Sequence, residues 1–148
     1  MEKLITVAEA MGLYVGFRDL GEVNGYYLGS DLVVVNFRRS LRAQRVTLAH
    51  EIGHWHHDHD WSVSHDKARD EREANAYAAR LLIRRDDYRM AEAMAGPSVA
   101  GIAEILNVTP ELVRIRREDF ARDAAIAEEA ARLSLDLPDD LHDLPAAH

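Results

Sequence analysis

The stretch that decides the fold is TLAHEIGHWHHDHD, from Thr47 to Asp60, and it holds five of the chain's eight histidines. An apolar pattern at helical spacing runs through it and begins after Ser40, a residue type that often caps a helix N-terminus. The pattern predicts a helix from Leu41 to about His57. Several histidines therefore project from one helix.

Residues 50–54 of this helix read HEIGH, which is an HExxH motif. His50 and His54 lie four residues apart, so on a helix their imidazoles face the same way and can bind one Zn²⁺. Glu51 can act as general base on a metal-bound water without binding the metal itself. Gly53 is small enough to let a neighbouring segment approach closely. The sequence therefore predicts a metal site here.

A third metal ligand is expected on the following helix, in the carboxylate cluster DEREAN of residues 70–75. Glu71 and Asn75 lie four residues apart and share one helix face. We predict Glu71 as the third ligand and Asn75 as the acceptor for the free N–H of a ligand histidine. Glu73 points about 200° away from Glu71 and is the alternative ligand. A His₂Glu site with an open fourth position is hydrolytic, and its donor set suits zinc best.

Other residues near the motif have roles that the sequence leaves open. Three further histidines are alternative ligands or an exposed polar helix end: His56, His57 and His59. A hydrolytic site also needs a group that stabilises the oxyanion. The sequence offers four candidates without choosing among them: Tyr77, His65, Tyr26 and Tyr27. Tyr77 lies on the apolar side of its predicted helix, which favours a core position.

The rest of the pattern predicts an α+β fold. A helix over residues 3–13 precedes extended runs at Tyr14–Phe17, Gly25–Leu28 and Asp31–Phe37, and turn residues between them favour a three-stranded antiparallel sheet. Leu32–Val35 is apolar on both faces and marks the most buried strand. Further helices are predicted at about residues 66–83 (with Ser64 as N-cap), at 86–95, as a pair within 98–116, and at 118–133. We expect a core over residues 1–96, a helical subdomain over 97–134 and a disordered acidic tail over 135–148.

Composition limits the possible partners and compartment. The chain has 148 residues, a net charge of −8 and no cysteine, so cysteine-based zinc sites and nucleophiles are excluded. An acidic chain does not attract nucleic acid through its overall field, although arginines cluster at residues 38–45 and 114–117. The N-terminus does not resemble a signal peptide, and no apolar run approaches the roughly 18 residues of a membrane span. We therefore expect a cytoplasmic protein.

Three segments together resemble the ImmA/IrrE-type metallopeptidases of phages, mobile elements and bacterial regulators. They are RVTLAHEIGH at residues 45–54, EREANAYAARLL at residues 71–82, and the helical pair at residues 99–116. The resemblance covers most of residues 1–115. One departure is IRR at residues 83–85, where the family commonly has a proline soon after the Leu-Leu pair.

The resemblance implies a small zincin-like core, with a sheet packed on the HExxH helix and a following helix that bears the glutamate ligand. It implies zinc-dependent cleavage of a transcriptional repressor, with His50, His54 and Glu71 as ligands and Glu51 as general base. The alternative is a zincin-fold regulatory module that binds a protein or DNA without proteolysis. Residues 103–116 resemble a helix-turn-helix, which we interpret as a structural subdomain or a surface that recognises the substrate, in preference to a DNA reader.

Overall fold

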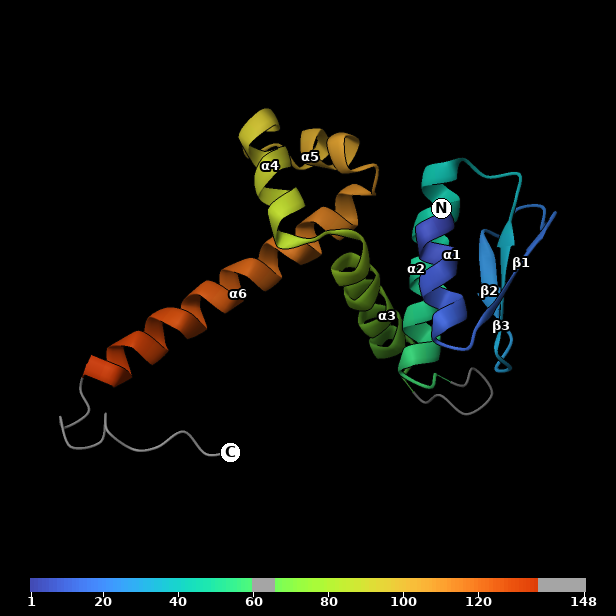
Figure 1. Cartoon of the computed structure of the whole chain (residues 1–148), viewed down its shortest axis with the longest axis horizontal. Helices are drawn as coiled ribbons and strands as arrows, with labels where there is room; N and C mark the ends of the chain where they lie inside the picture. The colour runs from blue at the N-terminus through green and yellow to red at the C-terminus, as the bar shows by residue number, and fades with distance from the viewer. Residues whose placement is uncertain (60–65, 136–148) are drawn as a thin grey trace. The chain divides into compact units, whose positions relative to one another are not determined.

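The structure is a computed structural model that describes residues 1–59 and 66–135 (Figure 1). These residues form six helices and three strands in the following order: α1 (Glu2–Ala10), β1 (Tyr14–Arg18), β2 (Gly25–Tyr27), β3 (Leu32–Asn36), α2 (Leu41–His56), α3 (Lys67–Leu82), α4 (Arg85–Ala95), α5 (Val99–Leu106) and α6 (Pro110–Leu135). The predicted α+β class is confirmed. The predictions for Ser64, His65 and nearly all of the acidic tail fall outside the described residues.

The sheet is mixed, so the prediction of an antiparallel sheet was wrong. β3 lies in the centre, pairs in parallel with β1 and pairs antiparallel with β2. Val33, Val34 and Val35 are buried, as predicted for the most apolar strand. The central position satisfies both hydrogen-bonding edges of this strand, which an edge position would not do.

Asn36, at the end of β3, explains why β1 and β2 are not neighbours. β1 ends and β2 begins beside this same end of the central strand, so residues 19–24 cross over it. The buried Asn36 amide donates hydrogen bonds to the carbonyl oxygens of Gly21 (3.0 Å) and Val23 (2.7 Å). Turn residues predicted the break between the strands, but this long-range amide contact determines how the chain crosses.

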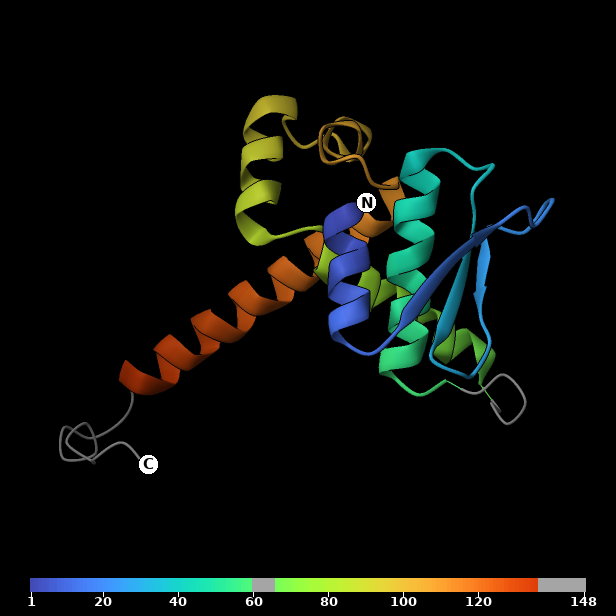
Figure 2. The same ribbon diagram turned by 45° about the vertical axis from the view of Figure 1, so that its right-hand side comes forward.

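α2 lies between the sheet and α3 (Figures 1 and 2). The Ser40 hydroxyl accepts a hydrogen bond from the Ala43 N–H at 3.2 Å, which confirms the predicted N-cap. Leu48, Ala49 and Ile52 are fully buried. Since α2 contacts both neighbours, it fixes the position of the residues on its polar face.

The helices α2 and α3 approach each other closely at Gly53 and Ala74. A Cβ atom built on Gly53 would lie 2.8 Å from the carbonyl oxygen and 2.9 Å from the Cα of Ala74. Both distances are too short for a real side chain, so the two backbones touch here because residue 53 is glycine. Ala78, one turn further along α3, is also fully buried.

The helix ends match the sequence signals in part. The side chain of Asp66 caps α3 by accepting from the Arg69 N–H at 2.9 Å, so the N-cap is not Ser64. Gly96, with φ 65°, ends α4 as predicted. Two helices were predicted within residues 110–133, and the structure has the single helix α6 instead. Residues 111–135 contain neither glycine nor proline, so nothing in the sequence interrupts it.

The chain divides into two compact units, Met1–Arg116 and Arg117–His148. The first contains the sheet and helices α1 to α5 together with the start of α6. The domain boundaries that we predicted at residues 96 and 134 stay predictions. Among the described residues, no helix combines the length and apolar character of a membrane-spanning segment.

Replacing Gly53 with alanine is expected to destabilise the fold. Overpacking costs about 1–3 kcal/mol, which exceeds the roughly 1 kcal/mol that alanine gains over glycine in a helix. We therefore expect Gly53→Ala to lower the free energy of unfolding in urea denaturation. Gly16→Ala is the control, because its Cβ would meet no atom closer than 3.9 Å. Equal stability of Gly53→Ala and the wild type would contradict the close contact.

Candidate metal centre

Three side chains from α2 and α3 converge on one point. His50 Nε2 and His54 Nε2 lie 2.9 Å apart. The Glu71 carboxylate reaches both, with Oε2 at 3.3 Å from His50 Nε2 and Oε1 at 3.1 Å from His54 Nε2. His54 is fully buried, whereas the side chains of His50 and Glu71 are 19% and 43% exposed. The cluster is therefore rooted in the core and open to solvent on one side.

The helix contact described above places these groups. Gly53 lies between the two histidines in sequence, and Ala74 lies between Glu71 and Asn75. The α2 and α3 backbones touch at Gly53 and Ala74. The side chains that flank these two residues on each helix are therefore brought close to one another.

Asn75 holds the first histidine. Its Oδ1 lies 2.8 Å from His50 Nδ1. An amide oxygen only accepts hydrogen bonds, so with the oxygen assigned to this side the imidazole carries its proton on Nδ1. The lone pair of His50 Nε2 then points toward His54 and Glu71. Asn75 thus lies where the role predicted for it requires.

His54 is held by His59, a residue that was predicted only as an alternative ligand. His54 Nδ1 lies 2.9 Å from His59 Nδ1. On its other side, His59 Nε2 lies 3.0 Å from Glu73 Oε2 and 3.6 Å from Asp70 Oδ1. Asp70 and His59 are both buried. Glu73 therefore faces away from the His50–His54 pair and belongs to a second layer behind it.

The electrostatics favour a neutral His54. Burial, followed by the nearby rings of His50 and His59, lowers the pKa of His54 to about 4. At neutral pH the ring is uncharged, which is the state that binds a metal ion.

Glu51 lies beside the cluster as a buried acid. Burial, followed by the negative charge of Glu71, raises the pKa of the Glu51 carboxyl to about 7. The backbone N–H of Tyr27, on strand β2, donates a hydrogen bond to this carboxyl and acts in the opposite direction. The side chain is thus fixed in place and has a pKa suited to accepting and releasing a proton at neutral pH.

The donor set fits a divalent cation. With protons on both Nδ1 atoms, the Nε2 atoms of His50 and His54 present two lone pairs to each other and to a carboxylate. Such an arrangement is repulsive unless a cation lies between the three groups, and two imidazoles with one carboxylate are ligands that zinc accepts. These three residues form one of two groups, among the described residues, with side chains close enough to share a metal.

The second group combines the residues considered as alternatives: His57, His59 and Glu73. The three histidines that were considered as an exposed helix end differ in their exposure to solvent. His56 and His57 are exposed, whereas His59 is buried. Sequence periodicity missed His59 because it lies beyond the end of α2. The available signal was Asp58, a residue type that tolerates the left-handed conformation observed there, with φ 54°.

The candidates for oxyanion stabilisation are only partly placed. Tyr77 was expected in the core, but its ring packs against His56 with centroids 4.6 Å apart and is partly exposed. Tyr26 is 37% exposed, and Tyr27 contributes its backbone N–H to Glu51. Tyr27 therefore contacts the site through its backbone N–H, and not through the side-chain hydroxyl that was considered for the oxyanion.

The arginines near the start of α2 are engaged within the protein. They pair as follows: Arg38 with Asp19 at 2.9 Å, Arg39 with the Glu22 carbonyl, Arg42 with both Glu104 carboxylate oxygens at 2.9 Å, and Arg45 with the Leu106 and Asn107 carbonyls at 3.1 and 3.0 Å. The last two pairs connect α2 to the C-terminal end of α5. The side chains of this basic cluster are thus paired within the protein.

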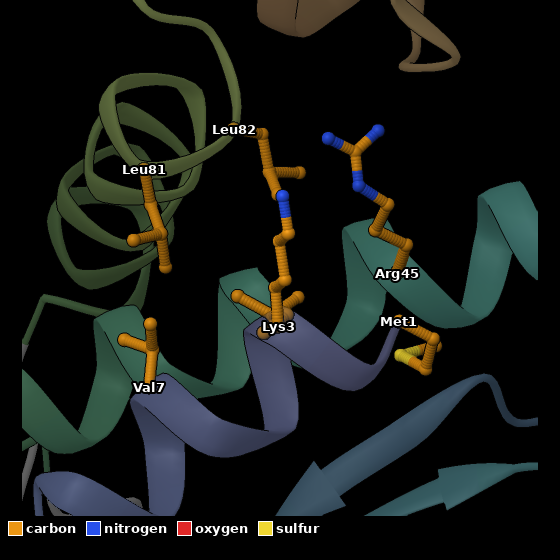
Figure 3. A pocket seen from close by; sticks show the side chains of 7 residues that line it. Met1, Lys3, Val7, Arg45, Leu81 and Leu82 are labelled. Atoms are coloured by element: carbon orange, nitrogen blue, oxygen red, sulfur yellow. The ribbon is translucent and has the colours of Figure 1, made fainter.

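A separate cavity of about 300 Å³ lies between α1, α2 and the end of α3 (Figure 3). Its lining is apolar apart from two cationic side chains: Met1, Lys3, Leu4, Val7, Arg45, Leu81 and Leu82. It shares no residue with the histidine cluster, and its lining contains no carboxylate and no histidine. The cluster on α2 and α3 is therefore the better candidate for a functional site.

Comparison with protein families agrees with the geometry. Residues 8–118, well over half of the chain, match the family model described as Peptidase M78, IrrE N-terminal-like domain. The matched segment contains both helices that carry the cluster. No curated protein matches the chain.

Metal content should separate the two glutamates. We expect about one zinc per chain in the wild type, because His50, His54 and Glu71 together form one binding site. Glu71→Ala should lose the metal, whereas Glu73→Ala should retain it at saturating zinc, since Glu73 faces His59. Elemental mass spectrometry on protein purified without nickel measures both. Loss of zinc in Glu73→Ala with retention in Glu71→Ala would reverse the assignment.

The raised pKa of Glu51 predicts a pH-dependent stability in EDTA-treated protein. Unfolding returns the carboxyl to its ordinary pKa of 4.5. The folded state therefore holds the proton more tightly, and stability falls as pH rises from 4.5 through 7, by about 3 kcal/mol at most. Glu51→Gln removes this loss, so the variant should exceed the wild type increasingly over that range. Urea titrations between pH 5 and 8 that give parallel curves would refute this.

Proposed function

The chain belongs to the M78 peptidase family with the IrrE N-terminal-like domain, and on that premise we propose that it is a zinc-dependent endopeptidase of the cytoplasm. One observation carries the proposal, namely the convergence of His50, His54 and Glu71 beside the buried carboxyl of Glu51. Two imidazoles and a carboxylate with one open side are the donors of a hydrolytic zinc site.

The chemistry divides between the metal and the protein. Bound zinc supplies a positive charge that lowers the pKa of the attacking water and polarises the scissile carbonyl. Glu51 accepts the proton that the water releases and passes it to the leaving amine, and a pKa near 7 suits both transfers. The Tyr27 N–H holds the carboxyl, so this residue needs little rearrangement during the reaction.

The sheet offers a place for an extended substrate next to this acid. β2 is an edge strand, and the Tyr27 N–H bonds Glu51 rather than β3. The outer edge of β2 therefore borders the cluster. A peptide in extended conformation could pair with backbone groups along this edge, which would bring its carbonyl toward Glu51.

We further propose that the substrate is a transcriptional repressor or a similar regulatory protein. The family resemblance supports this substrate class. The internal pairing of the four arginines between residues 38 and 45 also favours a protein substrate over nucleic acid.

A cleavage assay with matched variants tests this function. The zinc-loaded chain is incubated with a library of proteome-derived peptides, and with a folded DNA-binding protein fraction eluted from heparin, and new N-termini are identified by mass spectrometry. We expect internal cuts by the wild type, and a loss of about 10²-fold or more in Glu51→Gln, which keeps its zinc but lacks the base. Equal activity of the two proteins would refute the role of Glu51. No cuts in either substrate set would refute endoproteolysis and favour a binding module.

A further inference from the structure

We propose that His59 is a positioning residue for the metal centre, which holds His54 in the orientation and tautomer that present Nε2 to the metal. This inference rests on the proposed function. It concerns a residue outside the HExxH motif and outside the glutamate helix. Three observations carry it: the backbone turn that places His59, its hydrogen bonds, and the surroundings of the neighbouring acids.

The backbone turn at the end of α2 brings His59 over His54. The Asp58 N–H donates to the Trp55 carbonyl at 3.0 Å, and the His59 N–H donates to the His54 carbonyl at 3.0 Å. With Asp58 in the left-handed conformation, these two bonds form a Schellman motif, in which the last residue regularly packs its side chain on the residue five positions earlier. In most proteins that contact is apolar, and here it joins two imidazoles.

The hydrogen bonds define a direction for the protons. The Glu73 carboxylate lies 3.0 Å from His59 Nε2 and accepts a hydrogen bond from that nitrogen. The other ring nitrogen, His59 Nδ1, then presents a lone pair that accepts from His54 Nδ1–H at 2.9 Å. His54 consequently keeps its lone pair on Nε2, toward His50 and Glu71. His59 thus does for His54 what Asn75 does for His50.

A second metal ion is the competing use of His59, and the geometry argues against it. The His57 and His59 rings are nearly parallel, with an interplanar angle of 14° and centroids 5.3 Å apart, whereas ligand imidazoles direct their lone pairs to one point. Arg69 lies 3.7 Å from both Asp70 and Glu73, and a cation there opposes another. The three groups are better explained as support for His54.

Zinc affinity measured by competition with a chromophoric chelator tests the inference. His59→Leu removes the acceptor, so we expect zinc binding weaker by about 10- to 100-fold. His59→Asn keeps an oxygen acceptor near the position of Nδ1 and should restore most of the affinity. His56→Leu is the matched control, because His56 is an exposed histidine that packs on Tyr77 and contacts none of the ligands. Visible absorption of the Co²⁺-loaded proteins should change in His59→Leu and not in His59→Asn.

The outcomes separate this inference from the proposed function. A wild type without zinc affinity would overturn both. A wild type that binds zinc, with His59→Leu equal to it in affinity and Co²⁺ spectrum, would overturn the inference alone. Two zinc ions per chain, one of them lost in both His59→Leu and His57→Leu, would also overturn it. Equal losses in His59→Leu and His59→Asn would show that the acceptor is not the operative feature.

Discussion

The backbone contact between Gly53 and Ala74 is the constraint on which the site depends. Each ligand projects from a helix, and a helix fixes only the direction of a side chain relative to its own axis. For ligands on two helices to reach the same metal ion, the separation of the helices must therefore be closely fixed. Direct contact of backbones provides such a limit, because atoms at van der Waals distance cannot approach further and a larger residue would hold them apart. A methyl group added at position 53 would therefore disturb the metal centre as well as the core.

Burial shifts the pKa of two residues of the site, His54 and Glu51, in opposite directions. A buried acid and a buried imidazole are each disfavoured in their charged forms. At His54 the neutral form is what a metal needs, so burial assists the ligand. At Glu51 burial lifts the pKa into the range where proton transfer occurs in both directions, while one backbone N–H limits the shift. The same desolvation therefore prepares a ligand and a base that are three residues apart on one helix.

The sequence predicted what depends on local spacing and residue type. His50 and His54 share a helix face, Glu71 and Asn75 share another, and the structure brings both faces together. The valines of β3 were correctly predicted as the most buried strand. The parallel pairing of β1 with β3 could not be predicted, because a buried hydrogen bond from Asn36 to a distant loop decides it. The place of His59 was missed because a turn beyond a helix end has no periodicity, and α6 was divided in the prediction although no residue within it stops a helix.

The edge of the sheet has a consequence for how the protein behaves at high concentration. An exposed strand edge invites other chains to pair with it, and such pairing is the first step of aggregation. β2 is three residues long, and the carboxyl of Glu51 takes one of its outward N–H groups. A single short peptide can still align there, whereas a growing stack of strands would meet an acidic group and run out of backbone partners. The short length of β2 and the carboxyl on its outward N–H therefore both limit the pairing of further strands at this edge.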